Sequence, residues 1–265
     1  MSEKIKLCDL SKCYGCRACQ VACKQWNQLE ATQTRNSGSY QNPPDLQPNN
    51  WAVIQYQEVS DDNGGVKWLF RKQSCMHCTD AACVTVCPSG ALYYTKYGTV
   101  GVHNDKCIGC KECVSVCPFG VPQYDAATDK VYKCDMCLSR IENDMEPACV
   151  KACPTGALQF GDKAEMLEAA YRRVEALGGD ASVYGDKFVG GMHMIYVLPE
   201  KVSVYEGLPE HPRVPLSVVA WKDWLKPLSL LATGGVIGAS FLHYITHGPK
   251  TPDEDTGQVD AKGGE

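Results

Sequence analysis

The sequence predicts an α+β fold of two similar small modules with loop insertions, followed by one C-terminal transmembrane helix. Three observations lead to this prediction. Sixteen of the 17 cysteines stand in four short runs of four. Two of these runs begin alike and the other two end alike, which indicates a repeated unit. Residues 228–246 contain no Asp, Glu, Lys or Arg, which is typical of a membrane span.

The spacing of the cysteines is that of iron–sulfur ligands. Residues 107–118 follow the C-x2-C-x2-C-x3-C-P pattern of bacterial [4Fe-4S] ferredoxins, in which the fourth cysteine binds a neighbouring cluster. Gly15 and Gly109 fit a tight loop that passes close to a cluster. We therefore expect four [4Fe-4S] clusters. Their candidate ligands are Cys13, Cys16, Cys19 and Cys23 (run one), Cys75, Cys78, Cys83 and Cys87 (run two), Cys107, Cys110, Cys113 and Cys117 (run three), and Cys134, Cys137, Cys149 and Cys153 (run four).

Zinc is the main alternative metal, because paired C-x2-C elements also occur in zinc ribbons. A structural zinc site uses four ligands and requires neither a third C-x2-C step nor a C-x3-C-P ending. A disulfide framework does not suit such regular runs. Iron–sulfur binding is favoured, and a zinc-binding scaffold protein is the alternative from another functional class.

The beginnings and endings of the runs predict how they pair. Runs two and four end in Cys-Pro-Ser-Gly-Ala-Leu (87–92) and Cys-Pro-Thr-Gly-Ala-Leu (153–158), whereas runs one and three begin with Lys-Cys-x-Gly-Cys-x-x-Cys. Two-cluster ferredoxins place the first kind of half before the second. Residues 75–117 therefore resemble one ferredoxin in natural order, and runs four and one resemble another that closes in space. Pairing run one with two, and three with four, is the alternative.

In the favoured pairing, the fourth cysteines are exchanged between the two runs of each pair, as in ferredoxins. The resemblance then implies four ligand sets, which we number as clusters. They are Cys13, Cys16, Cys19 and Cys153 (cluster 1); Cys23, Cys134, Cys137 and Cys149 (cluster 2); Cys75, Cys78, Cys83 and Cys117 (cluster 3); and Cys87, Cys107, Cys110 and Cys113 (cluster 4).

Composition and missing motifs exclude several functions. The formal net charge of −5 and the pI near 5.7 argue against nucleic-acid binding. We find no nucleophile constellation, P-loop or dinucleotide-binding motif, so no active site is expected in this chain. The first residues lack the apolar segment of a signal peptide. Cluster assembly needs reduced thiols, so we expect cytoplasmic folding and, if the protein is exported, passage with a partner that carries the signal.

The elements of the first half follow in order. The polar residues 24–50 predict a long surface loop that wraps around this protein or a partner. Residues 51–59 and 66–71 flank an Asp-Asp-Asn-Gly-Gly turn and predict a β-hairpin inserted at 51–71. Short strands are expected at 92–94 and 99–102. A helical turn is expected at 138–143, within either a docking excursion or a tolerated insertion.

The second half begins with a predicted helix. Asp162-Lys-Ala-Glu165 is typical of a capping box, and the helix is expected to end at Gly178-Gly179. A strand follows at 192–198 and extended chain to 215. One helix face is formed by Leu167, Ala170, Tyr171, Val174 and Leu177. The predicted domains are 1–74 with 122–160 (module A), 75–121 (module B), 161–215 (helix and strand extension), 216–248 (membrane anchor) and 249–265 (acidic, disordered tail).

Residues 228–246 have the length of a membrane span. Nineteen residues at about 1.5 Å each reach roughly 28 Å, close to the hydrocarbon thickness of a bilayer. Trp221 and Trp224 before the stretch and Tyr244 near its end suit the two membrane interfaces. We predict a transmembrane helix, and a buried helix of a soluble protein is the alternative.

Small residues in the predicted span indicate a membrane partner. Gly234 and Gly238 form a small-xxx-small pattern that lets a second helix approach closely. An integral membrane partner is therefore implied. For His243, packing or hydrogen bonding to this neighbour is favoured over haem ligation.

Outside the runs, the chain resembles the iron–sulfur (β) subunit of membrane-bound formate dehydrogenases, among the four-cluster subunits of molybdopterin oxidoreductases. The resemblance covers nearly the whole chain. The stretches that carry it are Tyr-Gln-Asn-Pro-Pro-Asp-Leu (40–46), Glu-Pro-Ala-Cys-Val-Lys-Ala-Cys-Pro-Thr-Gly-Ala (146–157), Tyr-Glu-Gly-Leu-Pro (205–209) and Trp-Lys-Asp-Trp-Leu-Lys-Pro-Leu (221–228).

The resemblance implies a function and two partner subunits. A molybdenum or tungsten pterin subunit oxidises formate, and this chain relays the electrons through four clusters to a membrane subunit with haem b, which reduces quinone. The chain itself binds no small-molecule substrate. The nearest alternative is the same relay role in a hydrogenase or another molybdopterin oxidoreductase.

The resemblance also implies a place in the cell. It predicts a single-pass protein of the bacterial inner membrane with its cluster domain on the periplasmic face. The basic residues that flank the helix weakly favour a cytoplasmic cluster domain instead. Three of them, Arg213, Lys222 and Lys226, precede the helix, and two, Lys250 and Lys262, follow it. Export driven by a partner can override so small a difference in charge, so we expect the periplasmic placement that the resemblance implies.

Several single residues have two interpretations. The unpaired Cys8 is expected to be a small buried side chain rather than a ligand. His77, between Cys75 and Cys78, either donates a hydrogen bond to cluster sulfur or is an ordinary loop residue. In runs one, three and four, a lysine directly precedes the first cysteine. Each of these lysines either offsets the negative charge of a cluster or is solvated. These lysines are Lys12, Lys106 and Lys133.

Overall fold

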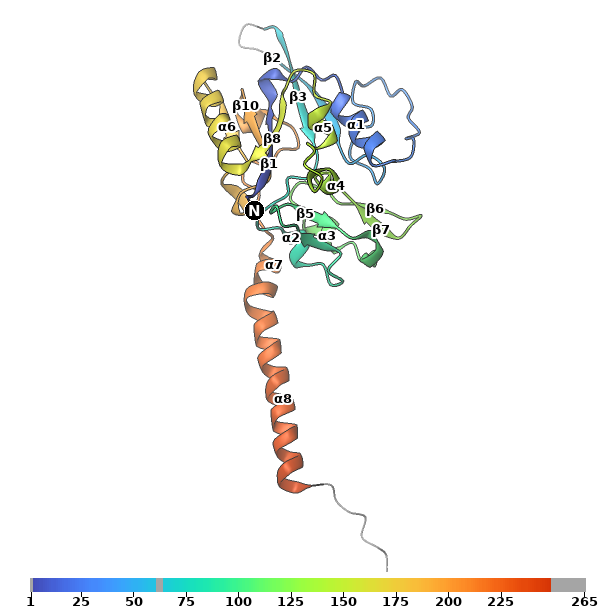
Figure 1. The fold of residues 1–265 in the computed structure, drawn as a ribbon, viewed down its shortest axis with the longest axis vertical. Coiled ribbons are helices and arrows are strands. Elements are labelled where there is room, and N and C mark those ends of the chain that lie inside the picture. Colours follow the sequence, from blue (N-terminus) through green and yellow to red (C-terminus); the bar gives the residue numbers. More distant parts are fainter. Residues whose placement is uncertain (1, 61–63, 249–265) are drawn as a thin grey trace, which may run out of the picture. The chain divides into compact units, whose positions relative to one another are not determined.

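The computed structural model describes residues 2–60 and 64–248. The chain divides into two compact units, Met1–Val218 and Val219–Glu265 (Figure 1). The predicted tail at 249–265 lies outside the described residues, as do residues 61–63 in the turn of the predicted hairpin.

A four-stranded mixed sheet lies at the centre of the first unit. Its strand order is β8 (Leu158–Asp162), β1 (Lys4–Asp9), β10 (Met194–Leu198) and β9 (Ser182–Tyr184). β1 pairs antiparallel with β8 and parallel with β10. The first strand of the chain is therefore held between segments that follow it far along the sequence, with Cys8 beside Leu158 and Tyr196.

Successive strand residues point to opposite sides of the sheet, and both sides are buried. One face is covered by α6 (Lys163–Leu177), as Figure 1 shows. Ile5 and Leu7 of β1 and Ile195 and Val197 of β10 pack against this helix.

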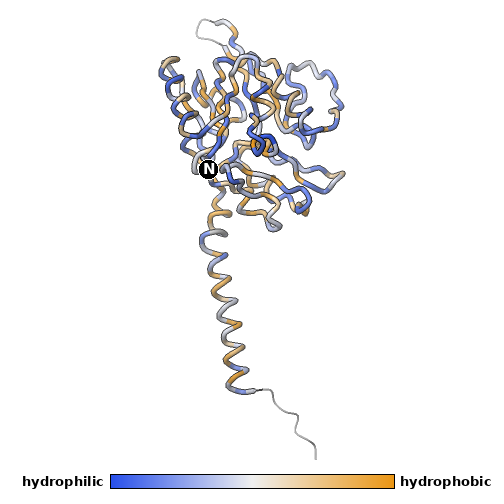
Figure 2. Tube along the Cα trace, in the orientation of Figure 1, coloured by the Kyte–Doolittle hydropathy of each residue, from blue (hydrophilic) through white to orange (hydrophobic). Residues whose placement is uncertain are grey.

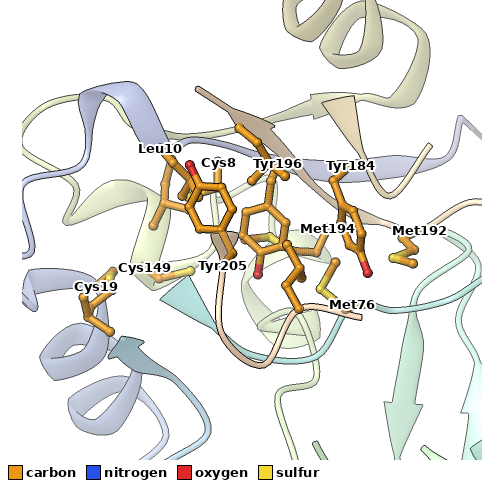
Figure 3. Close-up of a cluster of buried hydrophobic side chains, with 14 of the residues drawn as sticks. Cys8, Leu10, Cys19, Met76, Cys149, Tyr184, Met192, Met194, Tyr196 and Tyr205 are labelled. Atoms are coloured by element: carbon orange, nitrogen blue, oxygen red, sulfur yellow. The ribbon is translucent and has the colours of Figure 1, made fainter. Parts of the chain in front are cut away.

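The opposite face carries the main core and adjoins the cysteine runs. Cys8 of β1 and Met194 and Tyr196 of β10 point to this side (Figure 3). Cys19 and Cys149, from two different runs, belong to the same buried cluster of side chains. The core of the protein is thus continuous with the proposed cluster ligands.

Short helices contain or follow the cysteines of the runs. α1 (Ala18–Trp26) packs against α5 (Ala148–Lys151), and α2 (Ala82–Thr85) packs against α3 (Glu112–Val116). The contacts therefore join run one with run four and run two with run three. The remaining short helices of the first unit are α4 (Leu138–Ile141) and the 3-10 turns η1 (Leu10–Lys12), η2 (Asn104–Lys106), η3 (Phe188–Gly190) and η4 (Val202–Val204).

Three antiparallel hairpins complete the first unit. The predicted insertion hairpin is confirmed as β2 (Val53–Ser60) paired with β3 (Val66–Gln73). The predicted short strands are confirmed as β4 (Leu92–Tyr94) and β5 (Val100–Val102). The third hairpin was not predicted and consists of β6 (Gln123–Asp125) and β7 (Lys130–Tyr132).

Two expectations for the helix at 163–177 are wrong. Asp162 is its N-terminal flanking residue, but the side chain makes no capping hydrogen bond. Its carboxylate instead accepts hydrogen bonds from Ser2 and from Lys4 Nζ, the latter at 3.0 Å, because β8 ends beside the start of β1. Tyr171 does not join the apolar face; it is exposed, and its hydroxyl donates to Asp186.

The polar segment after α1 wraps around its own chain, which is one of the two predicted outcomes. Arg17 Nη1 donates to the Asn42 carbonyl at 3.0 Å, and Lys24 Nζ donates to the Asn49 carbonyl at 2.8 Å. Leu46 is buried against Val53 of the hairpin. These contacts fix the loop over run one.

The second unit consists mainly of one long helical segment. α7 (Leu216–Ala220) leads into a π-helical stretch, η5 (Trp221–Leu225), and then α8 (Lys226–His247). Figure 2 shows apolar residues along α8. The segment is long and apolar enough to cross a membrane, and none of its most apolar window is buried in the structure.

Two hydroxyl side chains in the first half of α8 are satisfied by the helix itself. The hydroxyls of Ser229 and Thr233 donate to carbonyls one turn earlier, at 2.8 Å in both cases. Such bonds let hydroxyls enter hydrocarbon without an unpaired donor.

Candidate metal centres

The four cysteine runs share one local conformation. In each run, the second residue after the first cysteine has a left-handed backbone, with φ of 75° at Gly15, 49° at His77, 68° at Gly109 and 66° at Met136. A left-handed residue reverses the direction of the loop within a few residues. The first two thiols of each run therefore turn toward the same side.

Gly15 and Gly109 have a second reason to be glycine. A Cβ at Gly15 would lie 2.7 Å from Phe70 Cδ1, and a Cβ at Gly109 would lie 2.6 Å from the carbonyl oxygen of Asp129. Both distances are too short for any side chain. The loops of runs one and three are therefore packed tightly against neighbouring hairpins.

One cavity is lined by the four cysteines proposed for cluster 1. Its wall comes from run one and from the end of run four. Lys72 and the unpaired Cys8 also line it. The four proposed ligands in the wall are Cys13, Cys16, Cys19 and Cys153.

A second cavity is lined by the four cysteines proposed for cluster 4. Leu92, Val102 and Val131 supply much of its apolar wall. The exposed Lys111 stands at its edge. The proposed ligands in the wall are Cys87 of run two and Cys107, Cys110 and Cys113 of run three.

The cysteines proposed for clusters 2 and 3 lie deeper in the molecule. Cys23 is close enough to Cys134, Cys137 and Cys149 for their charges to interact. For the other set, Cys78 interacts in the same way with Cys75, Cys83 and Cys117. None of these eight cysteines is exposed, in contrast to Cys16 and Cys110 of the other two sets.

The Cys-Pro endings surround the fourth sulfur with backbone donors. The N–H of Leu158 lies 3.4 Å from Cys153 Sγ. At Cys87, burial alone would raise the thiol pKa, but backbone N–H groups led by that of Leu92 lower it below its ordinary value. Donors to sulfur favour the thiolate that iron requires. The shared Cys-Pro-x-Gly-Ala-Leu sequence therefore forms a thiolate-binding turn.

Most of the other thiols are in an environment that disfavours their bare charge. Burial raises the pKa of Cys19, Cys83 and Cys137 to about 12 in each case. Such thiols stay protonated at neutral pH until metal displaces the proton. Soft thiolates are the donors that iron–sulfur clusters select.

These features are those of thiolate sites for [4Fe-4S] clusters. Each of the two cavities brings four cysteines of two different runs to one wall.

Three buried lysines accompany the cysteines, and the sequence indicated only one of them as a candidate. Lys133 is buried, whereas Lys12 and Lys106, the matching residues of runs one and three, are exposed. Lys6 and Lys72 are also buried and were missed. Burial alone would lower the pKa of Lys6, but the nearby Cys134 and Cys149 sulfurs raise it above its ordinary value.

His77 has a defined tautomer. The N–H of Val100 donates to its Nδ1 at 3.1 Å, so the neutral ring carries its proton on Nε2. That Nε2 is buried and has no hydrogen-bond partner among the described residues. Burial lowers the pKa of His77 well below its usual range, which keeps the ring neutral. A bond from Nε2 to cluster sulfur stays a prediction.

Comparison with protein-family models finds three matches. A 4Fe-4S dicluster domain matches residues 12–91, and a second 4Fe-4S dicluster domain matches residues 66–163. The third match, formate dehydrogenase N, transmembrane, covers residues 214–256. Two dicluster domains fit four [4Fe-4S] clusters, as the cysteine runs predicted.

Curated relatives align with most of the chain. The formate dehydrogenase iron-sulfur subunit of Haemophilus influenzae is 43% identical over 260 residues, which are 95% of this chain and 83% of the relative. The nitrate-inducible formate dehydrogenase iron-sulfur subunit of Escherichia coli is 43% identical over 262 residues, 96% of this chain and 89% of the relative. Formate dehydrogenase 2 subunit beta (cytochrome c-553) of Nitratidesulfovibrio vulgaris is 36% identical over 214 residues, 76% of this chain and 96% of the relative.

Proposed function

The chain belongs to the family of formate dehydrogenase iron–sulfur subunits, and from this premise we propose that it carries electrons from formate oxidation to a membrane subunit. It is an electron-transfer subunit with four [4Fe-4S] clusters and no catalytic domain of its own. When bound, the clusters accept and pass on single electrons. The observation that carries the proposal is the pair of cavities, each lined by four cysteines from two different runs.

We assign the sixteen cysteines to the four ligand sets given above as clusters 1 to 4. The packing of α1 against α5 and of α2 against α3 supports the exchange of fourth cysteines between runs one and four and between runs two and three. The alternative pairing would join runs whose helices do not make these contacts. On the same grounds we propose modules A and B, with their boundaries as predicted.

The proposed sets follow one another in a linear order. Cys19 of cluster 1 is near Cys149 of cluster 2, and Cys134 of cluster 2 is near Cys75 of cluster 3. Cys83 of cluster 3 is near Cys113 of cluster 4. The sets with exposed cysteines are 1 and 4. Electrons therefore enter and leave at clusters 1 and 4 and cross the protein through clusters 2 and 3.

The partners follow from the family. The chain works in a complex with a catalytic and a membrane subunit, and its helix is a single-pass membrane anchor. We propose that the catalytic subunit holds molybdenum or tungsten with pterin cofactors and that the membrane subunit holds haem b. We further propose that Gly234 and Gly238 pack against a helix of the membrane subunit, since a Cβ at either position meets nothing within 4 Å in the part of the chain that the structure describes.

The proposed location is the bacterial inner membrane with the cluster unit on the periplasmic side. Charges flanking the helix favour the opposite side only slightly, with three basic residues before it and two after it. Export together with a signal-bearing catalytic subunit explains how a chain with assembled clusters reaches that side. Protease protection in spheroplasts tests this orientation, because only a periplasmic unit is cleaved without lysis.

Low-temperature EPR of the detergent-extracted complex, purified through this chain, tests the function. Anaerobic formate is expected to produce signals of reduced [4Fe-4S] clusters of this subunit. Dithionite serves as the control that reduces the clusters by another route. If dithionite produces the signals and formate does not, in a complex that retains its catalytic subunit and metal, the relay stands and the formate assignment fails.

A further inference from the structure

Three lysine side chains are completely enclosed near the proposed cluster ligands. Their exposed fractions are 0% for Lys6, 2% for Lys72 and 1% for Lys133. They come from three separate segments: β1, β3 and the residue before run four. Lysine is among the residues that are almost never fully buried without a partner.

Each buried lysine lies beside a different part of the proposed relay. Lys6 Nζ is 3.9 Å from Cys134 Sγ of cluster 2. Lys72 lines the cavity of cluster 1 and also interacts with Cys149 of cluster 2. Lys133 interacts with cysteines of cluster 3, and its Nζ donates to the Cys134 carbonyl at 2.9 Å.

No carboxylate neutralises these lysines. Among residues 2–60 and 64–248, every ion pair of a lysine involves Lys4, Lys12, Lys67, Lys96, Lys163 or Lys201, and none involves Lys6, Lys72 or Lys133. A buried cation without a counter-charge is very costly. The anions available to these three are the cysteine sulfurs, which carry net negative charge once they hold a cluster.

We propose that Lys6, Lys72 and Lys133 are the counter-charges of clusters 1 to 3 and raise the reduction potentials of these clusters. Reduction adds one negative charge to a cluster, and a fixed buried cation stabilises that charge more than water-exposed lysines do. Among the described residues that line the cavity of cluster 4, the one lysine is Lys111, and it is exposed. The lysines thus set the potentials of the first three clusters above the value that their ligands alone would give.

Potentiometric EPR titration of lysine variants in the purified complex tests this inference. Lys72→Met and Lys133→Met remove the charge and keep a side chain of similar length. Each is expected to lower the equilibrium constant for reduction of a nearby cluster at least tenfold, which is about 59 mV for a one-electron couple. Lys72→Arg is expected to keep the potential close to that of the unaltered chain.

Lys106→Met is the matched control for Lys133→Met. Both lysines immediately precede the first cysteine of a run, but Lys106 is exposed. Its removal is expected to shift the potential of cluster 4 far less than tenfold in equilibrium constant, because solvent screens the charge. An equal shift in both variants would show that burial is irrelevant and would overturn the proposal.

Iron and sulfide contents separate charge from folding. If Lys72→Met retains four clusters at unchanged potentials, the proposal fails. If Lys72→Met loses clusters and Lys72→Arg retains them, the positive charge is required and the proposal stands. If both variants lose clusters, packing rather than charge is decisive at this site, and the proposal fails there.

This inference rests on the proposed ligand sets, and its failure is distinguishable from theirs. Absence of four [4Fe-4S] clusters from the unaltered complex would refute the sets and the relay. Four clusters whose reduction potentials do not change when the buried lysines are replaced would refute only the inference.

Discussion

The Cys8 thiol lies in the wall of the cluster 1 cavity together with four proposed ligands, yet nothing requires it to bind iron. Burial raises the pKa of Cys8 well above its ordinary value, as it also does for proposed ligands such as Cys19. Cys8 differs from the proposed ligands in its position, because it stands on the sheet strand β1 rather than on a run loop with a left-handed turn. We therefore expect the Cys8 side chain to pack as a small buried group rather than to bind iron.

Cys8→Ala is expected to retain all four clusters. Loss of a small buried side chain costs about 1 kcal/mol, which lowers the thermal unfolding midpoint by roughly 2–4 °C in a chain of this size. Iron content and a thermal melt of the purified complex measure the two effects. Cys13→Ala is the matched comparison and is expected to disrupt one cluster. Disruption of a cluster in Cys8→Ala would make Cys8 a ligand instead.

At the residue scale, the ligand role of the sixteen cysteines stays a prediction, and the sequence described their surroundings only in part. Glycine marked the left-handed position of runs one and three, but His77 and Met136 adopt the same conformation in the other runs without this signal. Tertiary contacts hold them there, as the bond from Val100 to His77 shows. Lys6 and Lys72 looked like ordinary strand lysines, because burial depends on neighbours far away in sequence.

At the scale of elements, the membrane helix has a face that meets no other side chain among the described residues. Gly234 and Gly238 are four residues apart and lie on one side of α8, since the helix has 3.6 residues per turn. A Cβ at either glycine meets nothing within contact distance. Any packing effect of larger side chains there must come from a neighbouring subunit.

Gly238→Leu is expected to weaken attachment of the membrane subunit. Forcing a large side chain into a tight helix contact costs about 1–3 kcal/mol, and each 1.4 kcal/mol lowers affinity about tenfold. Copurification of the membrane subunit after detergent extraction measures the loss. Ala232→Leu, on the opposite side of α8, is the control and should leave copurification unchanged. Equal loss in both variants would refute the glycine face.

Periodic and turn-bounded elements were predictable, whereas elements held by distant partners were not. The hairpin of β2 and β3 has a turn signal between two strand-like stretches, so its pairing is local. The pairing of β1 with β10 joins the two ends of the first unit and leaves no local signal. The capping box at Asp162 failed for the same reason, because its carboxylate bonds to Lys4 at the beginning of the chain.

For the whole molecule, the two halves of the proposed module A come from opposite sides of the proposed module B in the sequence. The beginning of run one meets the end of run four because β1 lies beside β8, directly after run four, and enters run one through η1. Sequence similarity to ferredoxin halves was enough to propose this closure. The sheet that brings the halves together was not predictable, because its strands are short and separated by the whole of module B.

Paired cysteine variants test the closure of module A across the chain. Cys13 and Cys153 line one cavity and are proposed to bind the same cluster. The double variant Cys13→Ala with Cys153→Ala is therefore expected to retain three intact [4Fe-4S] clusters, as each single variant does. The double variant Cys13→Ala with Cys107→Ala is the control. It removes one ligand from each of two proposed clusters and is expected to retain two intact clusters.

Iron content and Mössbauer spectra of the purified complexes count the intact clusters. Each double variant removes two thiols, so general destabilisation affects both alike. The first double variant retains three clusters only if Cys13 and Cys153 bind the same cluster. If both doubles retain two clusters while every single variant retains three, Cys13 and Cys153 belong to different clusters. Run four would then supply its last thiol to another run, and the electron path would begin in a different part of the fold.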